Sequence, residues 1–137
     1  MSAPTVTPSV IYTDAFAGID WLTRVLGMTL LSRHPHADGT VAFAELAWRT
    51  GVVFVASRPA ADNPWSRVGV AAIALVAADA ESVRRHYHQA VGAGADVVRE
   101  LHVSRTPAYP QGSAQFDLRD PEGNLWTVGT YQPKSGR

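Results

Sequence analysis

The chain has 137 residues, of which 46% are hydrophobic and 18% charged, a composition typical of one globular domain and unlike a disordered chain. The formal net charge of +0 argues against nucleic acid or an anionic membrane surface as a partner, because both attract a basic protein face. With no cysteine, the chain has no disulfide, thiolate metal site or cysteine nucleophile. The longest apolar run, residues 68–78, is too short to span a bilayer, and we expect a soluble cytoplasmic protein.

The first part of the chain predicts one helix among short strands. Residues 6–12 predict a strand, after which Thr13 or Asp14 suits the N-cap of a helix, since a short oxygen-bearing side chain can accept from the free amides of the first turn. Apolar residues at helical spacing follow, and Gly27 suits the position just past the helix end. Three more strands are then predicted over residues 28–34, 41–49 and 52–57, with a Thr50-Gly51 turn between the last two.

A break at residues 59–67, which contains two prolines and Trp65, is followed by the same order of elements. Asp79 suits a second N-cap, and Gly92 suits the end of that second helix. Residues 105–112 contain two further prolines and predict a loop. The strands of this half are predicted over residues 68–77, 96–104, 113–119 and 125–131.

The two halves repeat each other at nearly constant spacing. Asp14 and Asp79 are 65 residues apart (79 − 14), as are Gly27 and Gly92 (92 − 27). Three pairs in the later hairpins are 72 apart: Glu45 and Asp117, Leu46 and Leu118, Gly51 and Gly123. A duplicated unit explains this pattern. The sequence therefore predicts an α+β fold of two tandem β-α-β-β-β modules, over residues 5–58 and 68–132, joined by the linker 59–67 within one domain, 1–137.

The repeat, the Gly-Ala-Gly-Ala run at 92–95 and the segment Phe116-Asp-Leu-Arg-Asp-Pro-Glu-Gly-Asn-Leu-Trp together resemble the glyoxalase/bleomycin-resistance/dioxygenase superfamily, also called the vicinal oxygen chelate superfamily. The resemblance runs from about residue 6 to residue 132. It implies two cupped mixed sheets around a cleft with helices outside, and often a homodimer. Enzymes of this family hold a divalent metal in the cleft with two side chains from each half, usually His or Gln and Glu.

The resemblance places these four metal-ligand positions at Thr7, Val55, Ala72 and Thr127. None of the four is an imidazole or a carboxylate, and two of them have no lone pair to offer a metal ion. We therefore expect no metal cofactor of the family type, and we assign no catalytic residue.

Aromatic and polar side chains near the expected cleft are the better indication of function, because flat rings stack on planar ligands at low entropic cost. The predicted ligand-binding residues are Ser9, Trp48, Phe54, Trp65, His102, Tyr109, Gln115 and Thr127. Among them, His102 could also donate to a ligand or act as a base. The other histidines are interpreted as a solvated strand end (His34, His36) and as helix surface (His86, His88).

These features resemble the metal-free branch of the superfamily, which includes antibiotic-sequestering proteins of the bleomycin-resistance type. We therefore predict a dimeric protein that binds an antibiotic or another planar small molecule without breaking a bond, and that has no nucleic-acid or membrane partner. One alternative is a lyase, isomerase, epimerase or dioxygenase-like enzyme that acts on a small metabolite, with His102 or Glu45 as the base or with a metal held in an atypical way. Another alternative is an interaction module with a vestigial cleft.

Overall fold

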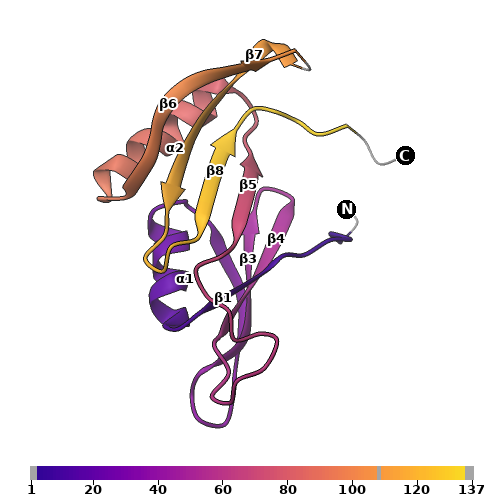
Figure 1. Ribbon diagram of the computed structural model, residues 1–137, viewed down its shortest axis with the longest axis vertical. Coiled ribbons are helices and arrows are strands. Elements are labelled where there is room, and N and C mark those ends of the chain that lie inside the picture. Colours follow the sequence, from indigo (N-terminus) through magenta and orange to yellow (C-terminus); the bar gives the residue numbers. More distant parts are fainter. Residues whose placement is uncertain (1–2, 108, 135–137) are drawn as a thin grey trace. The chain divides into compact units, whose positions relative to one another are not determined.

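The computed structural model describes residues 3–107 and 109–134, without the side chain of Tyr109. The chain forms two compact units, each a four-stranded mixed sheet with one helix (Figure 1). The first unit contains residues 3–71 together with Asp120–Asn124, and the second contains Ala72–Arg119 together with residues 125–134. The α+β fold of two β-α-β-β-β modules is thus confirmed.

In the first unit the strand order is β1-β4-β3-β2, with β1 parallel to β4 and the other pairs antiparallel. The strands are β1 (Ser9–Tyr12), β2 (Thr29–Pro35), β3 (Val41–Trp48) and β4 (Gly51–Ser57). The helix α1 (Ala15–Arg24) begins where the Asp14 side chain accepts from the Ala17 amide at 3.1 Å. Fully buried Leu22, Leu46 and Val55 belong to the core between this helix and the sheet.

In the second unit the order is β5-β8-β7-β6, with β5 parallel to β8. The strands are β5 (Ala72–Val76), β6 (Asp96–Thr106), β7 (Tyr109–Arg119) and β8 (Leu125–Gly129). The helix α2 (Ala80–Gly92) is capped by Asp79, which accepts from the Ser82 amide at 2.8 Å. Phe116 and Trp126 are 0% exposed, so the core of this unit also lies on the helix side of its sheet.

Several boundaries differ from the expectation; for example, β1 begins at Ser9 and not at residue 6, and β5 begins at Ala72 and not at residue 68. The predicted loop over 105–112 is largely strand, because β6 extends to Thr106 and β7 starts at Tyr109. β8 ends at Gly129, which pairs with Gln115, so the start of β7 has β6 as its one neighbouring strand. Pro110 fits there because a residue at a sheet edge can lack a backbone N–H donor. At the end of α2, Gly94 and not Gly92 has the left-handed conformation, with a φ of 80°.

The two central hairpins differ in turn length. Trp48 pairs with Gly51, so the first turn is Arg49-Thr50 and not Thr50-Gly51, and Arg49 has a φ of 51°. In the second hairpin Arg119 pairs with Leu125, which leaves a five-residue turn, Asp120–Asn124. Glu45 pairs with Phe54 as Asp117 pairs with Thr127, so the two modules correspond at a spacing of 72 before the turn (117 − 45) and 73 after it (127 − 54), and the predicted equivalence of Gly51 and Gly123 is wrong.

The longer turn has a structural role in the first unit. Asp120 is 4% exposed, and one of its carboxylate oxygens accepts from the Tyr12 hydroxyl at 2.6 Å. Glu122 accepts from the amides of Thr13 and Asp14, at 2.6 and 2.8 Å, just before α1 begins. Burial and the bond to Asp120 raise the pKa of Tyr12 far above its ordinary value, which keeps its hydroxyl a donor. The Asp-Pro-Glu-Gly-Asn segment thus holds the junction of β1 and α1.

Candidate functional site

Each sheet has one face covered by its helix and one open face, because successive side chains of a strand point to opposite sides. Residues that pair across neighbouring strands lie on the same face of the sheet. The side chains that alternate with the buried ones along each strand therefore belong to the open face. The first open face is defined here by Ser9, Ile11, His34, Phe43, Glu45 and Phe54. The second open face is defined by Ala72, Ala74, Arg99, His102, Gln115, Asp117 and Thr127.

The first open face carries a row of rings. The His34 ring stacks on Phe43 with centroids 4.4 Å apart, and Phe43 lies 5.8 Å from Phe54 at an interplanar angle of 60°. Phe43, Phe54 and Trp65 line a pocket of about 290 Å³, in which Ser9 also takes part. Trp65 is 64% exposed. The face therefore offers aromatic surface on which a planar molecule can stack.

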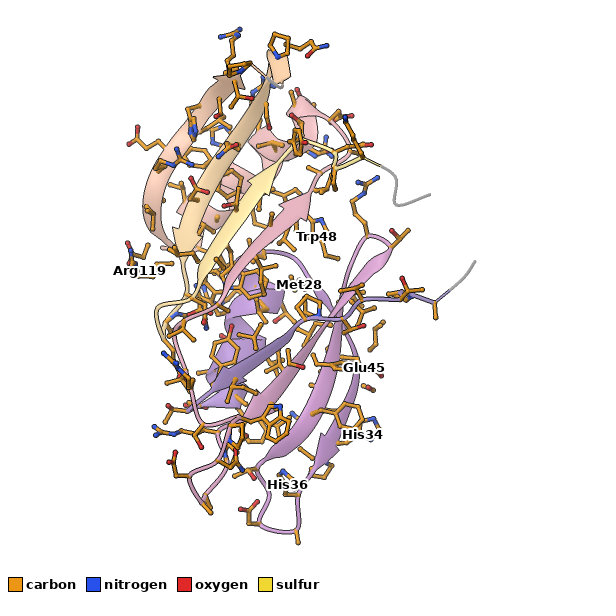
Figure 2. All side chains as sticks on the ribbon, turned by 45° about the vertical axis from the view of Figure 1, so that its right-hand side comes forward. Met28, His34, His36, Glu45, Trp48 and Arg119 are labelled. Carbon is orange, nitrogen blue, oxygen red and sulfur yellow. The ribbon has the colours of Figure 1, made fainter. Side chains whose placement is uncertain are left out.

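Glu45 lies beside this row, on the strand next to His34 (Figure 2). Its carboxylate accepts from the Ser32 hydroxyl at 2.5 Å, across the β2–β3 pair. A hydroxyl donor offsets the negative charge of a carboxylate less than a cation would. This end of the first open face therefore keeps a negative charge.

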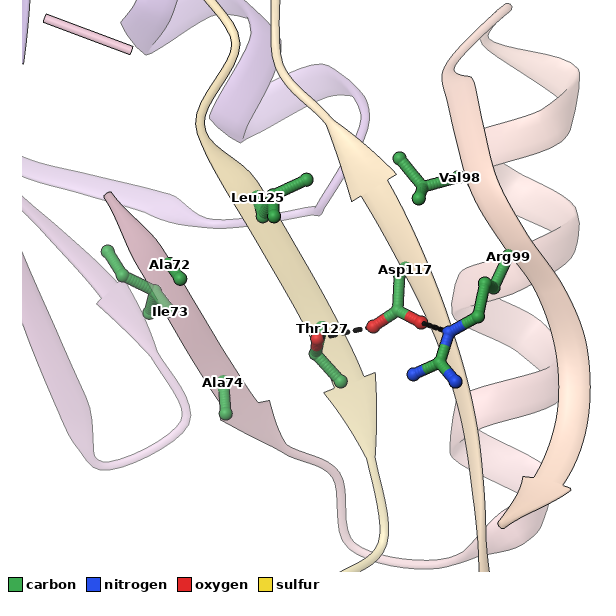
Figure 3. A pocket seen from close by; sticks show the side chains of 8 residues that line it. All are labelled: Ala72, Ile73, Ala74, Val98, Arg99, Asp117, Leu125 and Thr127. Carbon is green, nitrogen blue, oxygen red and sulfur yellow. Dashed lines mark hydrogen bonds and ion pairs between the residues drawn. The ribbon is translucent and has the colours of Figure 1, made fainter. Parts of the chain in front are cut away.

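The second open face contains a pocket of about 380 Å³ with a different character (Figure 3). Asp117 is 7% exposed, and its two oxygens accept from the Thr127 hydroxyl and from Arg99 Nε, the latter at 2.6 Å. Ala72 and Ala74 on β5 belong to the same lining. This face therefore combines a polar cluster with room left by small side chains.

The predicted ligand-binding residues fall into separate groups. Ser9, Phe54 and Trp65 line the pocket of the first open face, whereas Thr127 lines that of the second. His102 and Gln115 are cross-strand partners on β6 and β7. The side chain of Tyr109 lies outside the described part of the structure.

Trp48 requires a correction, because its side chain is only 8% exposed and belongs to the core. It lies two residues after buried Leu46 on β3, and strand alternation gives the two side chains the same covered face. Phe43 and Arg99 are among the pocket-lining residues that the sequence does not predict. Their cross-strand positions opposite His34 and Asp117 depend on irregular pairing in β2–β3 and β6–β7, which residue spacing does not reveal.

The family's metal positions can be placed more accurately with the observed pairing. Thr127 pairs with Asp117 as Phe54 pairs with Glu45, so Phe54 corresponds to Thr127 and the choice of Val55 is wrong by one residue. Val55 itself is 0% exposed. The corrected set is Thr7, Phe54, Ala72 and Thr127. Among the residues that the structure describes, no group of three or more His, Cys, Asp or Glu side chains could hold a metal ion. This donor set does not fit a divalent metal bound as in the family's enzymes.

His102 has one nitrogen engaged and one available. Its Nδ1 lies 2.7 Å from the Glu100 carbonyl oxygen, and the carbonyl requires a hydrogen on that nitrogen. In the neutral ring Nε2 then carries the lone pair, and this atom is buried with no hydrogen-bond partner among the described residues. Such a histidine can accept a proton or a hydrogen bond at Nε2.

No helix in the described part of the chain is both long and apolar enough to cross a membrane.

Comparisons with known proteins identify a family and solved structures with this architecture. A family model described as the Glyoxalase/Bleomycin resistance protein/Dioxygenase superfamily matches residues 5–128. The solved structure of TioX from Micromonospora sp. ML1 is 30% identical with a TM-score of 0.75, and the match covers 96% of this chain and 100% of that chain. A search of curated proteins finds no match.

Two further structures share the fold at lower identity. A lactoylglutathione lyase from Agrobacterium tumefaciens is 19% identical with a TM-score of 0.65, with 92% of this chain and 93% of that chain covered. A glyoxalase/bleomycin resistance protein from Streptomyces sp. CB03234 is 20% identical with a TM-score of 0.65, with 88% and 94% covered.

Proposed function

The chain belongs to the Glyoxalase/Bleomycin resistance protein/Dioxygenase superfamily, and we propose that it binds a planar small molecule on its open sheet faces without a metal ion. The observation that carries this proposal is the row of rings on the first open face, where Phe43 and Phe54 line a pocket together with Trp65. Rings held by neighbouring strands are already ordered, so a stacked ligand costs little side-chain entropy.

The donor set supports binding without a metal. Thr7, Ala72 and Thr127 bring one or no oxygen each, and Phe54 occupies the fourth position with a ring. Where the family's enzymes have a metal ligand on the last strand of the first module, this chain has aromatic surface. At this position a ligand would stack on the Phe54 ring, whereas in the family's enzymes the residue coordinates a metal ion.

We further propose that the ligand is an antibiotic or a similar planar compound and that the protein is a homodimer. Exposed apolar side chains on the outer strands β2 and β6 support association between copies, since such patches mark interaction surfaces. These side chains are Leu30, Leu31, Val98 and Val103.

The proposal is tested by calorimetric titration with 2-naphthylmethanol, a planar neutral probe. We expect saturable binding by the wild type and about tenfold weaker binding by Phe54→Ala, which removes a stacking surface worth about 1–2 kcal/mol. Phe16→Ala is the matched control, because Phe16 is an exposed ring, 48% accessible, on α1, the helix that covers the opposite side of the first sheet. Absence of wild-type binding, or equal losses in the two variants, would contradict the proposal.

A second candidate function is an enzyme with His102 as general base, favoured by Nε2, which has no hydrogen-bond partner among the described residues but is buried and must become accessible to a substrate. Its reaction would be an isomerisation, epimerisation or elimination begun by proton removal from a small metabolite. Turnover by the wild type that is lost in His102→Ala, with the fold intact by circular dichroism, would favour this function over binding alone.

A further inference from the structure

We propose that the second open face recognises a carboxylate, and that Arg99 is the residue that binds it. The ligand class is then a small monocarboxylic acid with an apolar, planar body. This inference rests on the proposed function, because it requires that the open faces bind small organic molecules.

The hydrogen-bonding capacity of Arg99 is only partly used. Its Nε donates to Asp117, while neither terminal nitrogen has a hydrogen-bond partner among the described residues. In Figure 3 the dashed line from Arg99 starts at Nε, and the two terminal nitrogens extend beyond it without one. The side chain is 58% exposed and lines the pocket. Two adjacent terminal nitrogens in one plane match the two oxygens of a carboxylate.

Asp117 determines which anion suits this arrangement. Each of its oxygens already accepts one hydrogen bond, from Thr127 and from Arg99, and the residue is only 7% exposed, so a ligand donor has little access to it. Its negative charge beside the guanidinium offsets part of the positive charge, which disfavours a dianion such as a phosphate monoester. A monoanion that takes the two terminal nitrogens is the better fit. The fixed Nε contact also holds the guanidinium plane, which reduces the entropy lost on binding.

The rest of the lining is apolar and suits the body of such an acid. Besides the polar cluster, the pocket is lined by Ala72, Ile73, Ala74, Val98 and Leu125. Alanines on β5 leave space next to Thr127, and the pocket volume of about 380 Å³ is within the usual range for ligand pockets. A flat hydrocarbon body can therefore lie against this strand while its carboxylate reaches Arg99.

The first unit has no carboxylate–arginine pair at the position that corresponds to Asp117 and Arg99 in the described structure. There Glu45 occupies the position of Asp117, but its cross-strand partner is Ser32 instead of an arginine. In the described part of the first open face no arginine pairs with the Glu45 carboxylate, so this face is less suited to an acidic ligand.

The experiment compares two probes of similar shape, 2-naphthoate and 2-naphthylmethanol, on the wild type, Arg99→Met and Arg84→Met by calorimetric titration. Arg84 is the matched control, because it is similarly exposed and paired with Glu81 on the surface of α2. We expect the wild type to bind 2-naphthoate about tenfold more tightly than the alcohol, as a charge-assisted bidentate contact allows. Arg99→Met should remove this preference by weakening the binding of 2-naphthoate about tenfold, whereas Arg84→Met should retain it.

The possible failures are distinguishable. Equal wild-type affinities for the two probes, unchanged by Arg99→Met, would overturn the carboxylate site and leave the proposed function standing. A similar loss in Arg84→Met would assign the preference to overall charge and overturn the site as well. Binding of neither probe by the wild type would overturn both the site and the proposed function.

Discussion

Replacement of Asp120 by alanine is expected to lower the free energy of unfolding by about 3–5 kcal/mol. The donors that converge on this carboxylate include the Tyr12 hydroxyl, the Asn124 side-chain amide, and the backbone amides of Glu122 and Asn124, at 2.6–3.0 Å. Tyr12 is 0% and Asn124 1% exposed, so neither side chain has water to replace the lost acceptor. A buried donor left unsatisfied costs its full desolvation penalty.

The measurement is urea denaturation followed by tryptophan fluorescence. Asp38→Ala provides the control, because Asp38 also accepts two hydrogen bonds, both from Thr40, but lies fully in solvent. Its midpoint should stay close to that of the wild type. If the two variants shifted the midpoint equally, the turn would not anchor the first unit as described.

Replacement of Gly69 by alanine is expected to destabilise the protein by more than about 3 kcal/mol and to reduce the yield of folded protein. Gly69 has a φ of 73°, which L-residues other than glycine rarely adopt. An added Cβ would also lie 2.3 Å from the Glu122 carbonyl oxygen, within the turn that holds α1. Backbone atoms on both sides of this contact must move for the methyl group to fit.

Gly92→Ala is the matched control for this substitution. Gly92 ends α2 with ordinary helical backbone, and nothing lies within 4 Å of its added Cβ. Alanine should leave stability unchanged or raise it by up to about 1 kcal/mol, since it favours the helix. Thermal unfolding followed by circular dichroism measures both variants. A melting temperature for Gly69→Ala close to that of Gly92→Ala would contradict the close packing of residue 69 against the turn.

Much of the fold could be predicted because its signals are local. Asp14 and Asp79 both cap helices as expected, since the capping geometry depends on only three or four neighbouring residues. The Asp-Pro-Glu-Gly-Asn turn was recognisable, although its anchoring of Tyr12 and the start of α1 involves residues more than 100 positions apart.

The candidate site was less accessible to sequence reasoning, because it depends on strand parity and register. A constant spacing of 72 pointed to Val55, whereas the shorter Arg49-Thr50 turn shifts the correspondence by one and exposes Phe54. A one-residue shift moves a side chain to the other face of a sheet. The same parity places Trp48 in the core.

The two open faces illustrate how a duplicated module can acquire two chemistries. Equivalent positions hold Glu45 with Phe54 in the first unit and Asp117 with Thr127 in the second. In the second unit Arg99 lies beside the carboxylate, whereas Ser32 takes the corresponding place in the first. The modules share backbone pairing, but the first presents rings and the second presents a guanidinium.

The central claim, ligand binding without a metal ion, is tested most directly by titrating 2-naphthylmethanol into two preparations of the wild-type protein. One is dialysed against a chelator, and the other is incubated with excess nickel, zinc, manganese and iron and then dialysed exhaustively, with metal content measured in both. We expect the same dissociation constant in the two preparations and no retained metal, because the corrected positions Thr7, Phe54, Ala72 and Thr127 lack imidazole and carboxylate donors. About one retained metal ion per chain, with probe binding only in that preparation, would contradict the claim and favour a metal-dependent enzyme.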